Sequence, residues 1–157
     1  DVRELRRALG TFATGVTIVT ARAVTGAPVG LTVNSFASVS LDPPLVLWSL
    51  RHASALLPYF ATAAAFAVHV LRADQAALAR RFAAPIPDRF DGVRWHPDER
   101  GLAVLPESLA RFECTVVAGH DAGDHRILLG SVDRHDVGQG EPLVFAGGTF
   151  RTLAGEP

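Results

Sequence analysis

The chain has 157 residues, of which 48% are hydrophobic and 20% charged, a composition typical of a globular domain with its own core. Its 15 basic and 16 acidic residues leave a formal net charge of −1, which argues against nucleic-acid binding, since that function needs a clustered basic surface. The longest nearly uncharged run, residues 61–71, is too short to span a bilayer, so no membrane partner is expected.

Cysteine usage and the N-terminus bear on where the protein works. Cys114 is the single cysteine, so no internal disulfide is possible, which fits a reducing cytoplasm. It lies in an alternating run beside Phe112 and Val116, which predicts a packed thiol rather than a reactive one. The charged first residues do not read as a signal peptide. We therefore expect one cytoplasmic domain over residues 1–157.

The N-terminal part of the chain predicts a helix and then a β-hairpin. Residues 2–10 carry apolar side chains at helical spacing, and Gly10 ends that pattern. Residues 15–22 are rich in β-branched side chains and predict a strand. The turn sequence at 25–28 then joins this strand to the next one as a hairpin.

The run from Gly30 to Pro44 alternates apolar and polar residues and predicts one continuous strand. Its polar face carries small neutral groups around one aromatic ring instead of the charges of an ordinary exposed face. Such a face suits a flat heterocycle with a hydrogen-bonding edge, of which a flavin is an example. The residues expected on that face are Thr32, Asn34, Phe36, Ser38 and Ser40, with Leu31, Val33, Ala37 and Val39 on the opposite one.

The rest of the chain alternates predicted strands and helices. Strands are expected at 45–50, 66–71, 112–118, 126–137 and 143–145, and helices at 52–64 and 73–83, separated by an extended excursion over 84–110. Strands outnumber helices and cluster at both ends of the chain. The predicted fold is therefore mainly β within the α+β class: an antiparallel closed or split β-barrel with peripheral helices.

Two segments carry basic residues near expected helix ends. The run Ser49-Leu50-Arg51-His52-Ala53-Ser54 joins a strand to a helix, where free N–H groups, a hydroxyl and a guanidinium make an anion site. The alternative is a plain N-cap by Ser54. Arg80, Arg81 and Phe82 end the later helix, where basic residues are favoured for electrostatic reasons alone.

The turn at residues 120–125 contains two histidines and two aspartates. A metal site, a solvated turn, and a turn that presents His125 to a ligand are the three interpretations. A metal site is the weakest, because a hairpin loop of this length does not readily converge four ligands. His69, by contrast, lies among valines of a predicted strand and is expected to be a satisfied, partly buried ring.

Familiar nucleotide and hydrolase motifs are absent, since the chain has no G-x-G-x-x-G after a strand, no P-loop and no G-x-S-x-G. Taken in order, however, several segments together resemble the short-chain flavin reductases, the reductase components of two-component flavin-dependent monooxygenases. The segments that carry this resemblance are 14–17, 30–44, 66–71, 78–83, 110–114, 123–127 and 142–145.

The resemblance implies a flavin reductase-like, FMN-binding split barrel and a homodimer with flavin near the dimer interface. It implies that the isoalloxazine lies against Thr32, Val33, Asn34 and Ser35, with Ser38 and Val39 beside them. It implies ribityl and phosphate contacts from Ser49, Leu50, Arg51, Ser54 and Ala55, and a further flavin contact from Arg81 and Phe82. His125 matches the histidine beside the nicotinamide, and Phe150 matches a position where the family often has tyrosine.

The function implied is reduction of FMN or FAD by hydride transfer from NADH or NADPH, with reduced flavin passed to a partner monooxygenase. His125 is expected to position the nicotinamide rather than act as a nucleophile, because hydride transfer needs no protein acid or base. One alternative is a non-enzymatic flavin-binding electron carrier or sensor on the same barrel. A pyridoxine-phosphate type oxidase is another, weakened by the few clustered basic residues.

Overall fold

A computed structural model describes all residues, 1–157. The chain is mostly β with few helices, and every strand pair is antiparallel, as the sequence predicts. None of its helices has the length and apolar character needed to cross a membrane. The helical elements are α1 (Val2–Leu9), α2 (Leu57–Thr62), the 3-10 turn η1 (Ala73–Gln75) and α3 (Ala76–Ala83).

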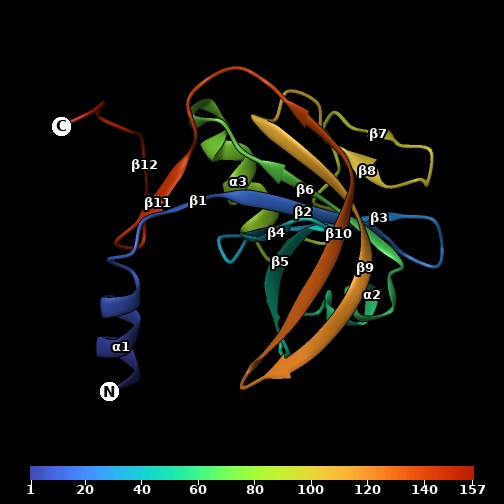
Figure 1. Cartoon of the computed structure of the whole chain (residues 1–157), viewed down its shortest axis with the longest axis horizontal. Helices are drawn as coiled ribbons and strands as arrows, with labels where there is room; N and C mark the ends of the chain where they lie inside the picture. The colour runs from blue at the N-terminus through green and yellow to red at the C-terminus, as the bar shows by residue number, and fades with distance from the viewer.

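A seven-stranded sheet forms the body of the molecule (Figure 1). Its strands, in spatial order, are β3 (Pro28–Val33), β2 (Thr17–Arg22), β6 (Ala65–Val70), β9 (Ala110–Ala122), β10 (His125–Val137), β5 (Pro44–Arg51) and β4 (Ala37–Leu41). The two edge strands, β3 and β4, are consecutive in the chain and joined by the short link 34–36. Because such a link spans at most about 15 Å, the two edges lie close together and the sheet curls strongly.

The expectation of one strand over Gly30–Pro44 is wrong, because the chain breaks at 34–36 and continues at the other edge of the sheet. The Ser35 hydroxyl explains the break, since it donates to the Ser49 carbonyl (3.0 Å) and accepts from the Ser49 N–H (2.9 Å). This pair of bonds turns the chain away from β3 and toward β5. A register shift between Ser38 and Ser40 further interrupts the predicted alternation of faces.

The helix expected over residues 52–64 is also shorter than predicted, since α2 begins only at Leu57. Pro58 accounts for this, because proline lacks an N–H and its ring clashes with the carbonyl four residues earlier, so it is tolerated only in a first turn. Ser54 is therefore not the N-cap residue. Its hydroxyl instead accepts from the Leu56 N–H (3.2 Å) in the turn that precedes the helix.

Most other predicted elements are confirmed within a few residues. The helix 2–10 is α1, the hairpin of β2 and β3 forms, and the helix 73–83 is η1 followed by α3. The excursion 84–110 contains only the short strands β7 (His96–Pro97) and β8 (Ala103–Val104). A three-stranded sheet of β1 (Thr14–Gly15), β11 (Val144–Ala146) and β12 (Thr149–Arg151) completes the fold, and β12 was not predicted.

Two hydrophobic clusters hold the body together. One fills the concave side of the curled sheet around Trp48, which packs edge-on against Phe60 and Phe66. The other lies between the sheet and α3 around Phe82 and Phe90. The Cys114 thiol is fully buried, as predicted, and burial raises its pKa to about 12. It is therefore protonated and shielded at neutral pH.

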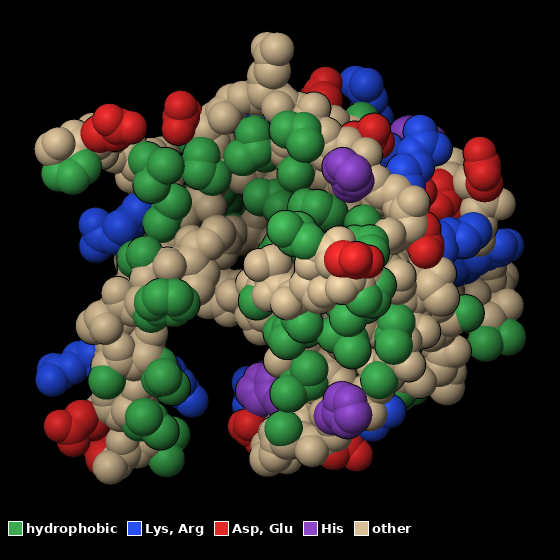
Figure 2. All heavy atoms as spheres, in the orientation of Figure 1, with side chains coloured by type: hydrophobic (Ala, Val, Ile, Leu, Met, Phe, Trp, Pro, Cys, Tyr) green, Lys and Arg blue, Asp and Glu red, His purple; other side chains and the backbone are tan.

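Residues 1–12 and the strands β11 and β12 are here called the arm. Helix α1 stands apart from the body (Figure 1), whereas Phe145 of β11 and Phe150 of β12 pack against the second cluster. The space-filling view shows a deep hollow between α1 and the body (Figure 2). No residue of α1 is buried. Its apolar side chains and those just after it are exposed, namely Val2 (69%), Leu5 (59%), Leu9 (67%) and Phe12 (79%).

Candidate functional site

Strands β5 and β10 bring two predicted site residues together. In their antiparallel register, His125 lies directly opposite Arg51, Arg126 opposite Leu50, and Ile127 opposite Ser49. Directly opposed residues of an antiparallel pair have Cβ atoms about 4.5–5.5 Å apart. The residue expected to meet a nicotinamide and the residue expected to meet a phosphate are thus immediate neighbours.

The turn before His125 fixes the orientation of its ring. Strand β9 runs to Ala122, so only Gly123 and Asp124 separate the two strands, and Gly123 has the left-handed φ of 60° that such a tight turn requires. The Asp124 carboxylate lies 2.6 Å from His125 Nδ1. This bond, with Arg51 adding a smaller electrostatic contribution, lowers the pKa of the Asp124 carboxyl. With Nδ1 engaged, Nε2 of the half-exposed ring is left for a ligand.

A second set of contacts, which the sequence reasoning missed, ties the chain after β5 to the same hairpin. The Asp121 carboxylate lies 3.1 Å from His52 Nε2 and accepts from the Arg126 guanidinium at 2.9 Å. These two partners, Arg126 first, lower the pKa of the Asp121 carboxyl. The His52 N–H also donates to the Asp124 carbonyl (2.9 Å). The backbone at Arg51 and His125 is therefore held in a fixed relation.

The residues at the end of β3 and in the following link differ in what they offer a ligand. The Thr32 hydroxyl donates to the Ala79 carbonyl of α3 (2.7 Å), and the Ser35 hydroxyl donates to Ser49. Both hydroxyls are thus already donors within the chain. Val33 is half-buried, whereas Asn34 is exposed. Asn34 is therefore the residue of this segment whose side chain is best placed to donate to a ligand.

The remaining residues of the predicted phosphate site fall in the turn after β5. Arg51 and Ala55 are exposed and Ser54 is half-buried, while Leu50 is buried in the core. The expectation that a helix N-terminus supplies N–H groups at Ser54 is wrong, because α2 starts three positions later. Any anion binding here would use the Arg51 guanidinium and the Ser54 hydroxyl.

Arg81 and Phe82 are committed to contacts within the chain. The Arg81 guanidinium donates to the carbonyls of Arg89 (2.7 Å), Asp88 (3.1 Å) and Asp91 (2.6 Å). Phe82 is fully buried and packs edge-on against Phe90, with ring centroids 5.0 Å apart. In this chain the pair therefore builds the loop after α3 and exposes little to a ligand.

Phe150 and the two exposed strand residues Ser38 and Val39 lie elsewhere. Phe150 belongs to β12 in the arm, where it packs against Phe145 and lies 5.2 Å beneath the Arg80 guanidinium. Figure 1 places this arm apart from the tip of the β9–β10 hairpin. Ser38 and Val39 are exposed on the edge strand β4. The single chain thus does not gather all the predicted residues around one point.

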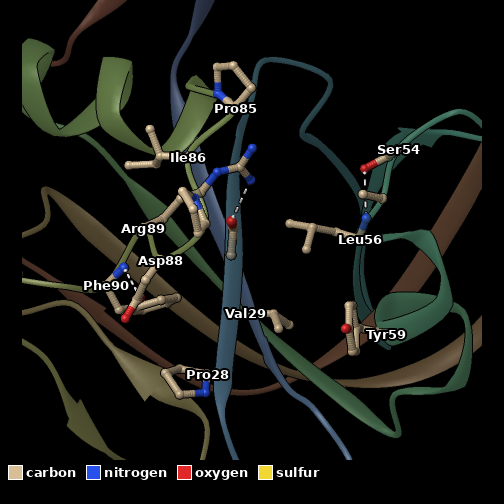
Figure 3. Close-up of a pocket in the computed structure, with 13 residues that line it drawn as sticks. Pro28, Val29, Ser54, Leu56, Tyr59, Pro85, Ile86, Asp88, Arg89 and Phe90 are labelled. Atoms are coloured by element: carbon tan, nitrogen blue, oxygen red, sulfur yellow. Dashed lines mark hydrogen bonds between the residues drawn. The ribbon is translucent and has the colours of Figure 1, made fainter.

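A cavity of about 560 Å³ adjoins the predicted phosphate turn and includes Ser54 and Ala55 in its wall (Figure 3). Tyr59, Arg89 and the backbone of Gly30 also line it. Neither Tyr59 nor Arg89 was singled out from the sequence, because both lie in segments without a recognisable motif. No group of three or more His, Cys, Asp or Glu side chains is arranged to hold a metal ion.

Comparison with known proteins identifies the class to which this fold and site belong. Residues 9–154 match the model of the family described as "Flavin reductase like domain". This match covers nearly the whole chain, so the chain belongs to the flavin reductase-like family. The resemblance stated from the sequence is confirmed.

Individual relatives support the same assignment. The chain is 53% identical over 148 residues to "FMN reductase (NADH) SmoA" of Agrobacterium fabrum, a match that covers 94% of this chain and 84% of that protein. It is 45% identical to "Flavin-dependent trigonelline monooxygenase, reductase component" of Acinetobacter baylyi, covering 84% of this chain but only 43% of that protein. The structure of Streptomyces globisporus "NADH:FAD oxidoreductase SgcE6 in complex with NAD and FAD fragments" superposes with a TM-score of 0.92 at 40% identity, covering 98% of this chain and 93% of that one.

Proposed function

We propose that the chain is a flavin reductase that uses NADH to reduce FMN or FAD. The observation that carries this proposal is the pairing of His125 with Arg51 across β5 and β10, with Asp124 on His125 Nδ1. A non-enzymatic flavin carrier needs a phosphate site but no oriented group for a nicotinamide. Relatives described as NADH-dependent reductases support the choice of donor.

The residues present fit a flavin in their donor chemistry. Exposed Asn34 suits the polar edge of the isoalloxazine, and Arg51 with Ser54 suits a phosphate. Thr32 and Ser35 help by holding the backbone of this segment rather than by donating to the ligand. Bound flavin supplies the hydride acceptor. Val33, Ser38, Val39, Ser49, Ala55 and Phe150 are the other proposed contacts. Leu50, Arg81 and Phe82, which are buried or bonded within the chain, are proposed to act by holding the elements around the site.

The chemistry asked of the protein is positioning. Asp124 holds the His125 ring through Nδ1, which leaves Nε2 to donate to or accept from the nicotinamide carboxamide. The Asp121 contacts keep this group at a set position relative to Arg51. Because the transferred hydride passes between two ligands, rate depends on their mutual distance and orientation, and no side chain needs to exchange a proton.

The proposed acceptor of the reduced flavin is a separate monooxygenase component. Two relatives are named as such reductase components, the trigonelline protein and "Flavin-dependent monooxygenase, reductase subunit HsaB" of Mycobacterium tuberculosis, which is 39% identical over 133 residues. A cytoplasmic location fits the single buried thiol of Cys114.

Steady-state oxidation of NADH, followed at the nicotinamide absorbance band, tests the reductase activity with FMN, FAD and riboflavin as acceptors. We expect turnover with at least one flavin, and NADPH serves as the comparison donor. Absence of turnover with every flavin and either donor would refute the proposal. Tight, stoichiometric binding of flavin without oxidation of NADH would instead favour the electron carrier.

For the architecture, we propose a single split-barrel domain over residues 1–157 that functions as a homodimer. The strongly curled sheet, whose edge strands are consecutive in the chain, supports the split barrel. The exposed apolar residues of the arm, Leu5, Leu9 and Phe12 among them, support the dimer, because unburied apolar surface of this kind marks interfaces. Light scattering of the wild type and of a Leu5→Glu/Leu9→Glu variant tests this, with a monomeric wild type as the contrary result.

A further inference from the structure

The cavity beside β3 has two walls of different character (Figure 3). The loop 85–90 forms one wall, residues 54–59 form the other, and the β3 backbone from Pro28 to Gly30 runs between them. Its volume of about 560 Å³ lies within the usual range for small-molecule sites, roughly 300–1,000 Å³. Neither wall contains His125.

Arg89 brings a guanidinium into this cavity that pairs with no carboxylate; Asp88 also lines the cavity, but its Oδ1 accepts from the N–H groups of Phe90 and Asp91. The Arg89 guanidinium donates to the carbonyls of Ala84 (3.0 Å) and Gly30 (3.0 Å) and forms no ion pair with a carboxylate. Partial burial lowers the pKa of the Arg89 guanidinium. A partly desolvated cation held only by neutral carbonyls favours an anionic ligand, because a phosphate restores the lost solvation through charge-assisted bonds.

The wall that carries Arg89 is built before any ligand binds. Arg81 donates to three carbonyls of the loop, and Pro85 and Pro87 restrict its backbone further. A preformed wall loses little conformational entropy on binding, so its contacts contribute more fully to affinity. This explains why Arg81 is turned toward the loop rather than toward a ligand.

The opposite wall offers an aromatic surface and a hydroxyl. Tyr59 is 42% exposed and borders the cavity. An exposed aromatic ring of this kind can stack on a nucleobase. The Ser54 hydroxyl accepts from the Leu56 N–H, which leaves its own proton to donate to a phosphate oxygen. The two walls therefore provide for a phosphate and for a flat ring.

Building on the proposed function, we propose that this cavity binds the adenosine monophosphate half of FAD, so that the chain prefers FAD to FMN. Ser54 and Ala55 belong both to this cavity and to the proposed flavin phosphate site. One bound ligand can therefore extend from the phosphate site into the cavity. Gly30 lies two residues before Thr32 on β3, roughly 7 Å along the strand. The relatives include both an FMN reductase and an NADH:FAD oxidoreductase, so family membership alone does not decide the flavin.

Equilibrium titration of FAD, FMN and ADP tests this proposal without any turnover. The wild type should bind FAD at least about 10-fold more tightly than FMN. Arg89→Gln should raise the Kd for FAD and for ADP by about 10-fold. The Kd for FMN should change by no more than about twofold, because only the adenosine half meets this guanidinium. Arg94→Gln is the matched control, since the Arg94 side chain is 79% exposed and lies outside the cavity.

Tyr59→Ser provides a second variant that leaves the Arg89 contacts intact, and thermal unfolding reports whether each variant folds. It should also weaken FAD and ADP but not FMN, and it decides the matter if Arg89→Gln does not fold. Equal weakening of FMN and FAD would overturn the proposal, because Arg89 would then hold the phosphate that both flavins share.

NADH also carries an adenosine half and is the other source of this chemistry. The KM for NADH, measured with FMN as acceptor, separates the two. We expect Arg89→Gln to leave it unchanged, and a raised KM with unaltered FAD affinity would overturn the assignment to FAD. A protein that binds FAD selectively yet never oxidises NADH would refute the reductase function while preserving this inference.

Discussion

His125 lies directly opposite Arg51 in the antiparallel ladder of β10 and β5, and the Asp124 carboxyl has its pKa lowered mainly by its hydrogen bond to His125, with a smaller contribution from the charge of Arg51. Both residues stand on strands of the main sheet rather than on long loops. Their separation is thus set by backbone hydrogen bonds, which gives a site for two stacked ligands a rigid frame. From this arrangement we expect different roles for the two side chains: His125 positions the nicotinamide, and Arg51 binds the flavin phosphate.

Replacing His125 with alanine should slow flavin reduction by about 10-fold or more, or about 1.4 kcal/mol, because the nicotinamide loses a positioning contact. FMN affinity should change little, since the phosphate contacts remain. Stopped-flow reduction and FMN titration measure the two quantities. His120→Ala is the control, being an exposed histidine of the same hairpin. Loss of FMN binding would instead assign His125 to the flavin.

Arg51→Gln should weaken both FMN and FAD by about 10-fold while leaving riboflavin unchanged, because only the phosphorylated flavins offer an anion to this guanidinium. Titration of the three flavins provides the measurement. The result expected for Arg89→Gln differs, since of the three flavins only FAD should bind that variant more weakly. If riboflavin weakened as much as FMN, Arg51 would be acting on the isoalloxazine or on the fold.

Gly130→Ala should destabilise the protein by about 1–3 kcal/mol through overpacking of the core. A Cβ at this position would lie 2.5 Å from Phe66 Cζ and 3.0 Å from Cys114 Cβ, so the surrounding side chains would have to move. Gly15→Ala is the matched control, because a Cβ there meets nothing within 4 Å. Urea unfolding of both variants checks this, and equal stabilities would contradict the packing argument.

Local sequence pattern was a sound guide where structure depends on local rules. The hairpin of β2 and β3 and the helix α1 follow from turn residues and periodicity. The break at 34–36 could not be predicted this way, because it depends on hydrogen bonds between Ser35 and Ser49 that only the tertiary fold creates. The late start of α2, by contrast, could have been predicted from the sequence, because Pro58 is tolerated only in the first turn of a helix.

The site shows the same division. The pattern singled out His125 and Arg51 as separate features, and their pairing emerged only from strand register. Arg89 and Tyr59 carried no motif, because a cavity wall made by a loop and a short helix has no periodic signature. The ligand contacts expected of Thr32 and Arg81 could not be checked from the sequence either. Their side chains are engaged by carbonyls that the fold brings to them, those of Ala79 and of the loop 88–91.

His69 gives the last prediction, which concerns acid stability. The ring is completely buried; Nδ1 lies 3.1 Å from the Ile18 carbonyl, and Nε2 accepts from the Leu105 N–H at 3.1 Å. The neutral ring with its proton on Nδ1 satisfies both partners. Protonation of Nε2 would instead set two N–H groups against each other. Burial, the main cause, lowers the pKa of His69 from 6.5 to about 4.

The direction of the pH effect follows from this lowered pKa. Above pH 6.5 the ring is neutral in both the folded and the unfolded chain, so the stability does not depend on its titration. Between pH 6.5 and about 4 the unfolded chain binds a proton that the folded chain does not, so the free energy of unfolding falls as the pH falls. By pH 5 the loss should reach about 2 kcal/mol.

A comparison with His69→Asn isolates this contribution, because asparagine offers a donor and an acceptor but does not titrate in this range. Urea unfolding at pH 7 and pH 5, at one protein concentration, gives the change in free energy for each protein. We expect the wild type to lose about 2 kcal/mol more than the variant over this interval, since all other titrating groups are common to both. An equal loss in the two proteins would mean that the folded chain accommodates the protonated ring.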